Sequence, residues 1–157
     1  MPASIEDLEK RLALLEDERA LRELMTRYSM YADLAYGEKY VNVFSETGAM
    51  DLESGRFEGQ HSLFHDFVIS RVTHRWPGRM QHWPVGPLLF DIHGDEAVAT
   101  GYSMVVGRTE GGELVVRSVS ANRWTFVRQD GQWLIQERLL RSLGSTEQAR
   151  VLGLDQD

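Results

Sequence analysis

The second half of the chain is divided by short glycine turns into four runs with the length and alternation of β-strands. The runs cover residues 80–92, 97–108, 114–128 and 133–143, and the turns lie at 93–95, 110–112 and 130–131. Strands joined by such short turns pair antiparallel, in the order in which they follow one another. The sequence therefore predicts a four-stranded antiparallel meander and confines the helices to the first half of the chain.

Helical spacing dominates the chain before this meander. The apolar residues Ile5, Leu8, Leu12 and Leu15 recur at steps of three and four, as on one face of an amphipathic helix. Ser4, followed by an acidic residue three positions later, supplies an N-cap. The pattern predicts one long helix, or two helices with a bend, over roughly residues 4–36.

Shorter elements are predicted between the long helix and the meander. They are a helix at 38–44, a strand at 49–52 with a brief return at 57–59, and a third helix at 60–72 that is broken at 75–78. Helices followed by a long curled meander predict an α+β fold, in which a cone-shaped antiparallel sheet wraps around the N-terminal helices.

The length of the chain fits a single domain. With 157 residues, residues 1–157 are expected to fold as one body. Residues 1–18 carry a narrow apolar stripe with charged flanks, which fits either an arm that packs on a partner subunit or an ordinary core helix. Residues 144–157 give no clear pattern, as is typical of a mobile tail. Because an open sheet face and an amphipathic arm both need cover, we expect a homodimer or homotrimer.

The composition excludes several classes of function. The chain contains no cysteine, which rules out disulfide scaffolds, thiolate nucleophiles and Cys-ligated zinc. Its net charge of −7 argues against binding nucleic acid through clustered cations. The acidic N-terminal segment differs from a signal peptide, and no apolar run approaches the length of a membrane span. These features predict a cytoplasmic protein that does not contact membranes.

Sequence motifs for nucleotide cofactors and for acyl-enzyme chemistry are absent. The chain has no GxxxxGK[ST], no GxGxxG opening a helix after a strand, and no GxSxG. His61 and His65 are four residues apart and can face one metal ion, but no HExxH motif completes a site, and two solvated histidines are the more common case. His93 falls in a glycine turn and is expected at the surface. We therefore expect neither a metal nor a cofactor.

Asp33 and His82 are the strongest candidates for chemistry. His82 opens the first strand of the meander beside Met80, Trp83 and Pro84, and such apolar company can desolvate an imidazole that serves as a base. The alternative is a hydrogen-bonded core histidine. Asp33 lies in an otherwise apolar helical segment, where a carboxylate needs a partner such as His82. The alternative for Asp33 is a cap of the next turn at the surface.

Aromatic and methionine side chains are the candidates to line a pocket around this pair. Three phenols on the same helical segment can donate hydrogen bonds without carrying charge, namely Tyr28, Tyr31 and Tyr36. By strand alternation, a further set either faces a pocket or packs in an ordinary core: Phe44, Met50, Trp76, Trp83, Tyr102, Met104 and Trp124.

Four longer segments carry a family resemblance. They are ERALRELMTRYSMYAD, VFSETGAMDLESGRFEGQHSLFHDF, QHWPVGP and NRWTFVRQDGQWLIQERLL. Together they resemble the SnoaL-like family of the nuclear transport factor 2-like superfamily, and the resemblance covers nearly all of residues 15–143. It implies a cone of curved antiparallel sheet closed by helices. It implies the reaction less closely, since the superfamily includes lyases, isomerases, cyclases and plain binding modules.

The resemblance also implies roles for four residues. Scytalone dehydratases, bile-acid 7α-dehydratases and lindane dehydrochlorinases use an Asp–His pair at the base of their pocket. Asp33 and His82 are similar to this pair, Tyr28 to an assisting tyrosine of the dehydratases, and Arg138 to a basic residue that some members direct into the cavity. The implied function is a cofactor-independent lyase, dehydratase or isomerase that acts on a hydrophobic small molecule.

Two other branches of the superfamily suggest different functions. Ketosteroid isomerases use a carboxylate base on the first strand, but the matching position here is Leu52, and the adjacent Asp51 and Glu53 are expected to face the other way. Small subunits of ring-hydroxylating dioxygenases share the fold without catalysing a reaction. The alternative function is therefore a non-catalytic ligand-binding or accessory subunit.

Overall fold

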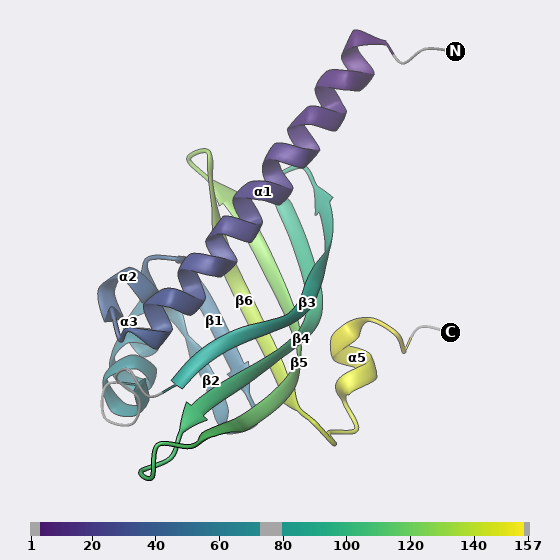
Figure 1. The fold of residues 1–157 in the computed structure, drawn as a ribbon. Helices are drawn as coiled ribbons and strands as arrows, with labels where there is room; N and C mark the ends of the chain where they lie inside the picture. The colour runs from purple at the N-terminus through teal and green to yellow at the C-terminus, as the bar shows by residue number, and fades with distance from the viewer. Residues whose placement is uncertain (1–3, 73–79, 156–157) are drawn as a thin grey trace.

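The computed structural model describes residues 4–72 and 80–155, in which a long helix crosses a curved sheet (Figure 1). The helices are α1 (Ile5–Asp33), α2 (Gly37–Val41), α3 (Gly59–Ser62), the π-helical η1 (Leu63–Val72) and α5 (Gln148–Leu152). The strands are β1 (Phe44–Leu52), β2 (Gly55–Glu58), β3 (Met80–His93), β4 (Glu96–Arg108), β5 (Leu114–Gln129) and β6 (Gln132–Ser142).

The six strands form one curved sheet in the order β2-β1-β6-β5-β4-β3. Strands β3 to β6 pair antiparallel with their sequence neighbours, which confirms the predicted meander. The pair of β1 with β6 is parallel, because the chain crosses from β2 to the far edge of the sheet before the meander leads it back beside β1. The protein is thus the predicted α+β cone, with one parallel pair in an otherwise antiparallel sheet.

The first helix is continuous and is begun by a capping box. The side chains of Ser4 and Asp7 satisfy each other's backbone N–H groups, as the sequence predicts. The C-terminal half of α1 buries Leu21, Leu24 and Tyr28 against the sheet. The N-terminal half extends beyond the sheet (Figure 1), and its apolar residues there are exposed. The expected homo-oligomer, with this segment as an arm, stays a prediction.

The elements between α1 and the meander differ in detail from the prediction. The second helix ends at Val41 instead of continuing to Phe44, because Phe44 begins β1 and points into the core, where it is 0% exposed. The third predicted helix is divided into α3 and η1. Its predicted break at 75–78 lies outside the described residues.

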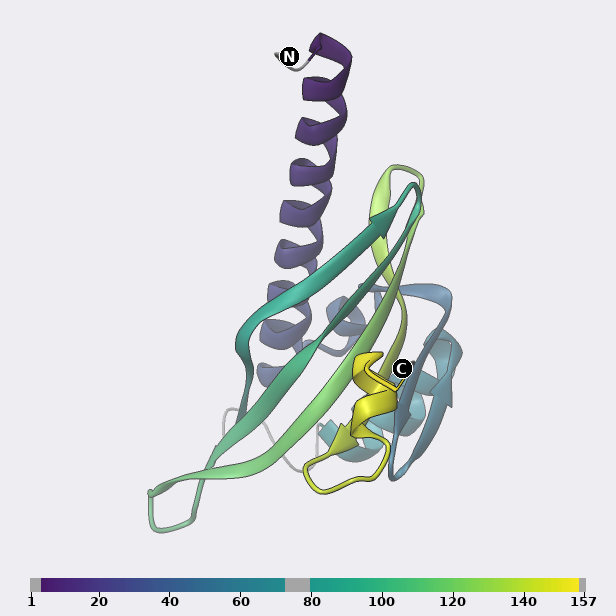
Figure 2. The same cartoon turned by 90° about the vertical axis from the view of Figure 1, so that its right-hand side faces the viewer.

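The segment after Gly144 contains regular structure that the sequence analysis does not predict. Helix α5 packs on the face of the sheet opposite to α1, as Figure 2 shows, and buries Val151 to 1% exposure. Ala121, which faces outward on β5, is 1% exposed as well. A five-residue helix is too short to show a helical period in the sequence. It is stabilised by its contact with the sheet, which the local sequence does not reveal.

An ion pair attaches the middle of α1 to the end of the sheet at the β5–β6 turn. Asp17 accepts hydrogen bonds from Nη2 of Arg128 at 2.6 Å and from Nε1 of Trp133 at 3.0 Å. The hydrogen bond from Arg128, with a smaller contribution from Trp133, holds the pKa of Asp17 below its ordinary value of 3.8. The ionised carboxylate therefore stabilises the packing of α1 on the strands β5 and β6.

Replacement of Asp17 by asparagine is expected to lower the free energy of unfolding at pH 7 by about 1–3 kcal/mol, as for hydrogen bonds to a charged group. Since the pKa of Asp17 is lowered in the folded state, its contribution is fully present above about pH 4 and is lost as the pH falls further. Urea unfolding of the wild type and of Asp17→Asn between pH 7 and pH 3 measures the expected result. The free energies of unfolding of the two proteins should become equal as the pH falls. Asp130→Asn, in the exposed β5–β6 turn, is the control. A constant difference at all pH values would contradict the assignment.

None of the helices in the described part of the chain combines the length and the apolar character that are needed to cross a bilayer.

Candidate active site

Asp33 and His82 are in direct contact where α1 meets β3. Asp33 is the last residue of α1, and His82 lies near the start of β3. Nδ1 of His82 is 2.7 Å from Oδ1 of Asp33, and the backbone N–H of His82 donates to the same oxygen at 3.0 Å. The side chains are 14% and 16% exposed for His82 and Asp33 respectively. The structure thus brings together two residues that are 49 positions apart in the sequence.

The contact with Asp33 selects one tautomer of the His82 ring. An ionised carboxylate only accepts hydrogen bonds, so Nδ1 of His82 carries the proton and Nε2 is the nitrogen that can take up another. Asp33 therefore fixes both the orientation and the tautomer of the His82 ring.

The hydroxyl of Tyr28 is held by two donors beside the pair. Nη1 of Arg138 donates to it at 2.7 Å, and the hydroxyl of Tyr40 donates at 3.0 Å. Burial, followed by the proximity of Tyr28, raises the pKa of Tyr40 well above its ordinary value of 10.0, so Tyr40 keeps its proton. Because both bonds use the Tyr28 oxygen as acceptor, the Tyr28 proton is left to donate to a bound molecule.

Arg138 is a buried cation with neutral partners. It lies on β6, is 5% exposed, and donates from Nε and Nη2 to Oδ1 of Asn122 at 3.1 and 2.8 Å. Its guanidinium lies 4.5 Å from the ring centroid of Trp124. No carboxylate of residues 4–72 or 80–155 pairs with it. A buried positive charge without an anionic partner favours negative charge that develops beside it.

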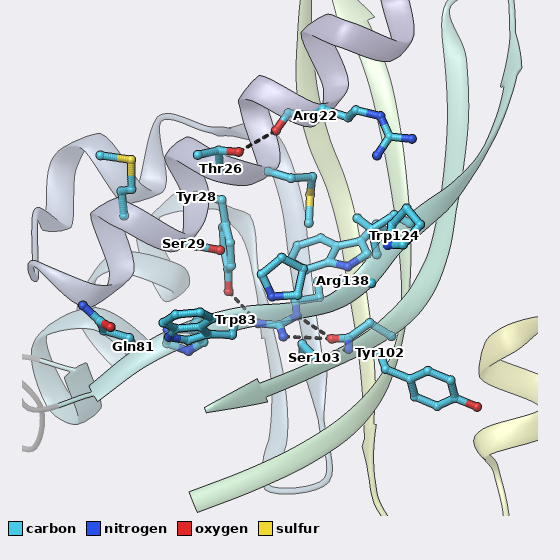
Figure 3. A pocket seen from close by; sticks show the side chains of 18 of the residues that line it. Arg22, Thr26, Tyr28, Ser29, Gln81, Trp83, Tyr102, Ser103, Trp124 and Arg138 are labelled. Carbon is cyan, nitrogen blue, oxygen red and sulfur yellow. Dashed lines mark hydrogen bonds between the residues drawn. The ribbon is translucent and has the colours of Figure 1, made fainter. Parts of the chain in front are cut away.

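A cavity of about 410 Å³ opens beside these residues, between α1 and β3 (Figure 3). Apolar and aromatic side chains form most of its wall, including Met25, Leu88, Phe90 and Trp124. The pairing of β3 with β4 is interrupted between Val85 and Leu89, where Gly86 has a φ of +79°. This irregular segment of β3 forms one side of the cavity.

A second cavity of about 260 Å³ lies between the sheet and η1. Four residues line both cavities, namely Tyr28, His82, Ser103 and Arg138. The second cavity is also lined by Tyr40, Met50, Phe67 and five serines. These four residues therefore lie between an apolar cavity and a more polar one.

The structure gathers most of the residues that the sequence analysis selected. The larger cavity includes Tyr28, Asp33, His82, Trp83, Tyr102, Trp124 and Arg138, and the smaller one includes Met50. Figure 3 shows that the ring of Tyr102 nevertheless extends away from the other lining side chains, and this residue is 45% exposed. Trp76 lies outside the described residues.

Four other selected residues line neither cavity. Phe44 is enclosed in the core between Tyr28 and Tyr40. Met104 is next to the inward-facing Ser103 on β4, so strand alternation turns it to the outer face. Tyr31 is partly buried against the core and Tyr36 is 50% exposed, and both rings approach Lys39.

The two acidic residues beside Leu52, Asp51 and Glu53, lie in different surroundings. Asp51 faces away from the cavities and accepts a hydrogen bond from Arg141 at 2.8 Å, as strand alternation predicts. Glu53 lies on the rim of the smaller cavity, which differs from the prediction, because β1 ends at Leu52 and alternation no longer applies after it. Its Oε1 accepts a hydrogen bond from the backbone of Ser142 at 3.1 Å.

Asn122, Ser103 and Tyr40 also line the cavities, although the sequence does not predict them as site residues. Asn122 is 1% exposed and connects Arg138 to Ser103, since its Nδ2 donates to the Ser103 hydroxyl at 2.9 Å. The available signal was its position two residues before Trp124, which places a polar side chain on the inward face of a strand.

His61 on α3 and His65 on η1 do not belong to a metal site formed by the described residues. The rings of His61 and His65 have centroids 4.5 Å apart, but within the described ranges no group of three His, Cys, Asp or Glu residues is arranged to hold a metal ion.

Comparisons with known proteins identify a related domain family and similar structures. The profile of the SnoaL-like domain matches residues 13–139. A nuclear transport factor 2-like protein with a cystatin-like fold from Novosphingobium aromaticivorans is 28% identical, with a TM-score of 0.87 over 97% of this chain and 99% of that one. Among curated proteins, none is similar enough in sequence to match.

Two further structures are similar in fold. A hexachlorocyclohexane dehydrochlorinase from Novosphingobium barchaimii is 18% identical, with a TM-score of 0.72 over 85% of this chain and 90% of that one. A Catenulispora acidiphila protein, solved in complex with S-DNPA, is 20% identical, with a TM-score of 0.68 over 83% and 94%.

The cone-shaped fold defines a member of the nuclear transport factor 2-like superfamily. Within it, the chain belongs to the SnoaL-like domain family, because the match covers most of its length. This family includes dehydratases and isomerases.

Proposed function

We propose that the protein is a cofactor-independent lyase of the dehydratase type, or an isomerase, that acts on a hydrophobic small molecule. The observation that carries the proposal is the 2.7 Å contact between Asp33 and His82 at the wall of an apolar cavity. A carboxylate that holds an imidazole in one tautomer is the arrangement that a general base requires.

The reaction begins with the transfer of a proton from a substrate carbon to Nε2 of His82. The electron pair of the broken C–H bond forms a double bond or an enolate, and Asp33 stabilises the imidazolium. In an elimination, the C–O bond to the leaving group breaks, and Tyr28 donates its proton so that water departs. In an isomerisation, Tyr28 donates a hydrogen bond to the enolate oxygen, and the imidazolium returns the proton to another carbon.

Arg138 supports this chemistry through Tyr28. Its guanidinium donates to the Tyr28 oxygen at 2.7 Å, and it is fixed from the other side by Asn122. When Tyr28 gives up its proton, the resulting negative charge lies against a cation that is already in place. The dehydrochlorinase from Novosphingobium barchaimii, which shares the fold, is named for an elimination reaction and supports this class of chemistry.

A screen in D₂O tests the proposal. Cyclic hydroxyketones and aromatic or steroid-like alcohols are incubated with the wild-type protein and with Asp33→Asn. We expect the wild type to give a conjugated product, or deuterium at the acidic carbon, with at least one compound. Asp33→Asn is expected to reduce that rate at least tenfold, since its amide can donate to Nδ1 and favour the wrong tautomer. Absorbance and mass spectrometry provide the measurement.

Asp91→Asn, at an exposed position of β3, is the matched control and should retain the wild-type rate. A folded Asp33→Asn variant with the wild-type rate would contradict the proposal. Binding of these compounds without turnover by the wild type would favour the alternative function, a ligand-binding or accessory protein.

A further inference from the structure

Three serines form a row across the inner face of the sheet, in the wall of the smaller cavity. Ser103 on β4 is directly opposite Ser120 on β5, and Ser120 is directly opposite Ser142 on β6. All three line the smaller cavity. Since neighbouring strands lie about 4.8 Å apart, the row spans about 10 Å. We refer to Ser103, Ser120 and Ser142 as the serine row.

Among the described residues, the fold uses only one hydrogen bond to the hydroxyls of this row, the one from Asn122 to Ser103. Ser120 is 3% exposed, yet its hydroxyl has no hydrogen-bond partner in the part of the chain that the structure describes, and the same holds for the Ser142 hydroxyl. The hydroxyl of Ser103 accepts a bond from Asn122 and keeps its own proton to donate. A buried hydroxyl such as that of Ser120 is normally satisfied, whereas Ser103 and Ser142 are only partly buried. All three hydroxyls can therefore bind a molecule that enters the cavity.

The two cavities differ in chemistry and lie on either side of the proposed base. Leu88, Phe90 and Trp124 line the larger cavity and can contact the apolar part of a ligand. The serine row lines the smaller cavity and can bind the polar part. His82 lines both. A substrate that extends from one cavity into the other therefore places the atoms between its apolar and polar parts beside His82.

One carboxylate and one guanidinium line the smaller cavity, so its walls carry no net charge that would select an anion. The carboxylate of Glu53 lies on its rim, and the guanidinium of Arg138 at its inner end is already bonded to Tyr28 and Asn122. Serine hydroxyls both donate and accept, which suits hydroxyl and carbonyl oxygens equally. Neighbouring positions of the row can each bind one oxygen.

We propose that the serine row is a binding subsite for neutral oxygen substituents, and that the substrate is an apolar ring system with at least two hydroxyl or carbonyl oxygens at one end. The inference rests on the proposed function, because it places the reacting carbon beside His82, between the two cavities. It adds the orientation of the substrate and the chemical class of its polar end.

Calorimetric titration with biphenyl probes tests the subsite without turnover. The probes are 5-phenylresorcinol, which has two meta hydroxyls on one ring, and 3-methylbiphenyl, which has no oxygen. We expect the wild type to bind the diol more tightly. The double variant Ser120→Ala/Ser142→Ala should weaken diol binding about tenfold or more, as for two hydrogen bonds, and change binding of 3-methylbiphenyl less than about twofold.

Thr100→Val is the matched control, because it removes a hydroxyl from the outer face of the same strand β4 as Ser103. It should leave both affinities unchanged, and thermal melting of each variant verifies folding. The inference is overturned if the wild type does not prefer the diol, or if biphenyl-3-carboxylate binds more tightly than the diol. It is also overturned if the serine double variant retains diol affinity.

The same titration separates this inference from the proposed function. Asp33→Asn should keep the preference for the diol, since the serine row does not contact Asp33. Loss of the preference in the serine double variant, together with full turnover by Asp33→Asn, would retain the subsite and reject the proposed base. Turnover that depends on Asp33, without a preference of the wild type for the diol, would retain the proposed base and reject the subsite.

Discussion

Replacement of His82 by alanine is expected to lower kcat/KM by about 10²–10⁴-fold, which is the usual contribution of a general base. The loss corresponds to about 3–5 kcal/mol of transition-state stabilisation. Steady-state kinetics with a substrate from the screen provides the measurement. The effect is large because the imidazole of His82 is the group that receives the proton. Asp33 acts only through His82, and Arg138 acts only through Tyr28.

The double variant Asp33→Asn/His82→Ala gives a sharper version of this prediction. Asp33 acts by orienting His82 and stabilising its charge, so it has little left to contribute once the imidazole is gone. We therefore expect the double variant to lose no more activity than His82→Ala alone, which is the non-additivity typical of groups that act as a unit. Two independent losses that multiply would contradict the assigned roles.

Two controls accompany the His82 variant. His93→Ala removes an exposed histidine at the other end of β3 and should retain the wild-type rate. Added imidazole should partly restore His82→Ala, because truncation of the side chain leaves space that adjoins the cavities. A folded His82→Ala variant with the wild-type rate would reject the proposed function.

Replacement of Phe44 by alanine is expected to lower the free energy of unfolding by about 3–5 kcal/mol, as for other buried phenylalanines. Phe44 is 0% exposed, and its ring lies 5.9 Å from that of Tyr28 and 5.6 Å from that of Tyr40. The sequence analysis left it open whether Phe44 lines a pocket or fills the core, and the cost of truncation distinguishes the two. Urea unfolding measures the difference.

Tyr36→Ala is the matched control for this prediction. Tyr36 is another aromatic residue of the same region but is 50% exposed, so its truncation should change stability by less than about 1 kcal/mol. A loss below about 1 kcal/mol for Phe44→Ala would contradict the enclosed position of that ring.

Local pattern was sufficient to predict the long helix and the meander. Glycine turns and strand alternation act over a few residues, and the apolar stripe of α1 follows the helical period, so these signals are present in any short window of the chain. The pairing of Asp33 with His82 was predicted for a different reason. A carboxylate in an apolar helical segment needs a partner, and the family resemblance pointed to His82.

The cavity walls were predicted less well, because they depend on contacts between distant segments. Phe44 and Met104 were candidates on the basis of residue type, but the core encloses the first and the outer face carries the second. Asn122 was missed, since its role arises from two hydrogen bonds to Arg138.

The sequence by itself determined the fold class and indicated that Asp33 needs a partner such as His82, because periodicity and the cost of a buried charge are properties of short segments. The tertiary structure decided where the substrate space lies. The serine row exists because the register of β4, β5 and β6 aligns Ser103, Ser120 and Ser142. That register depends on the whole curved sheet, including the irregular pairing within it.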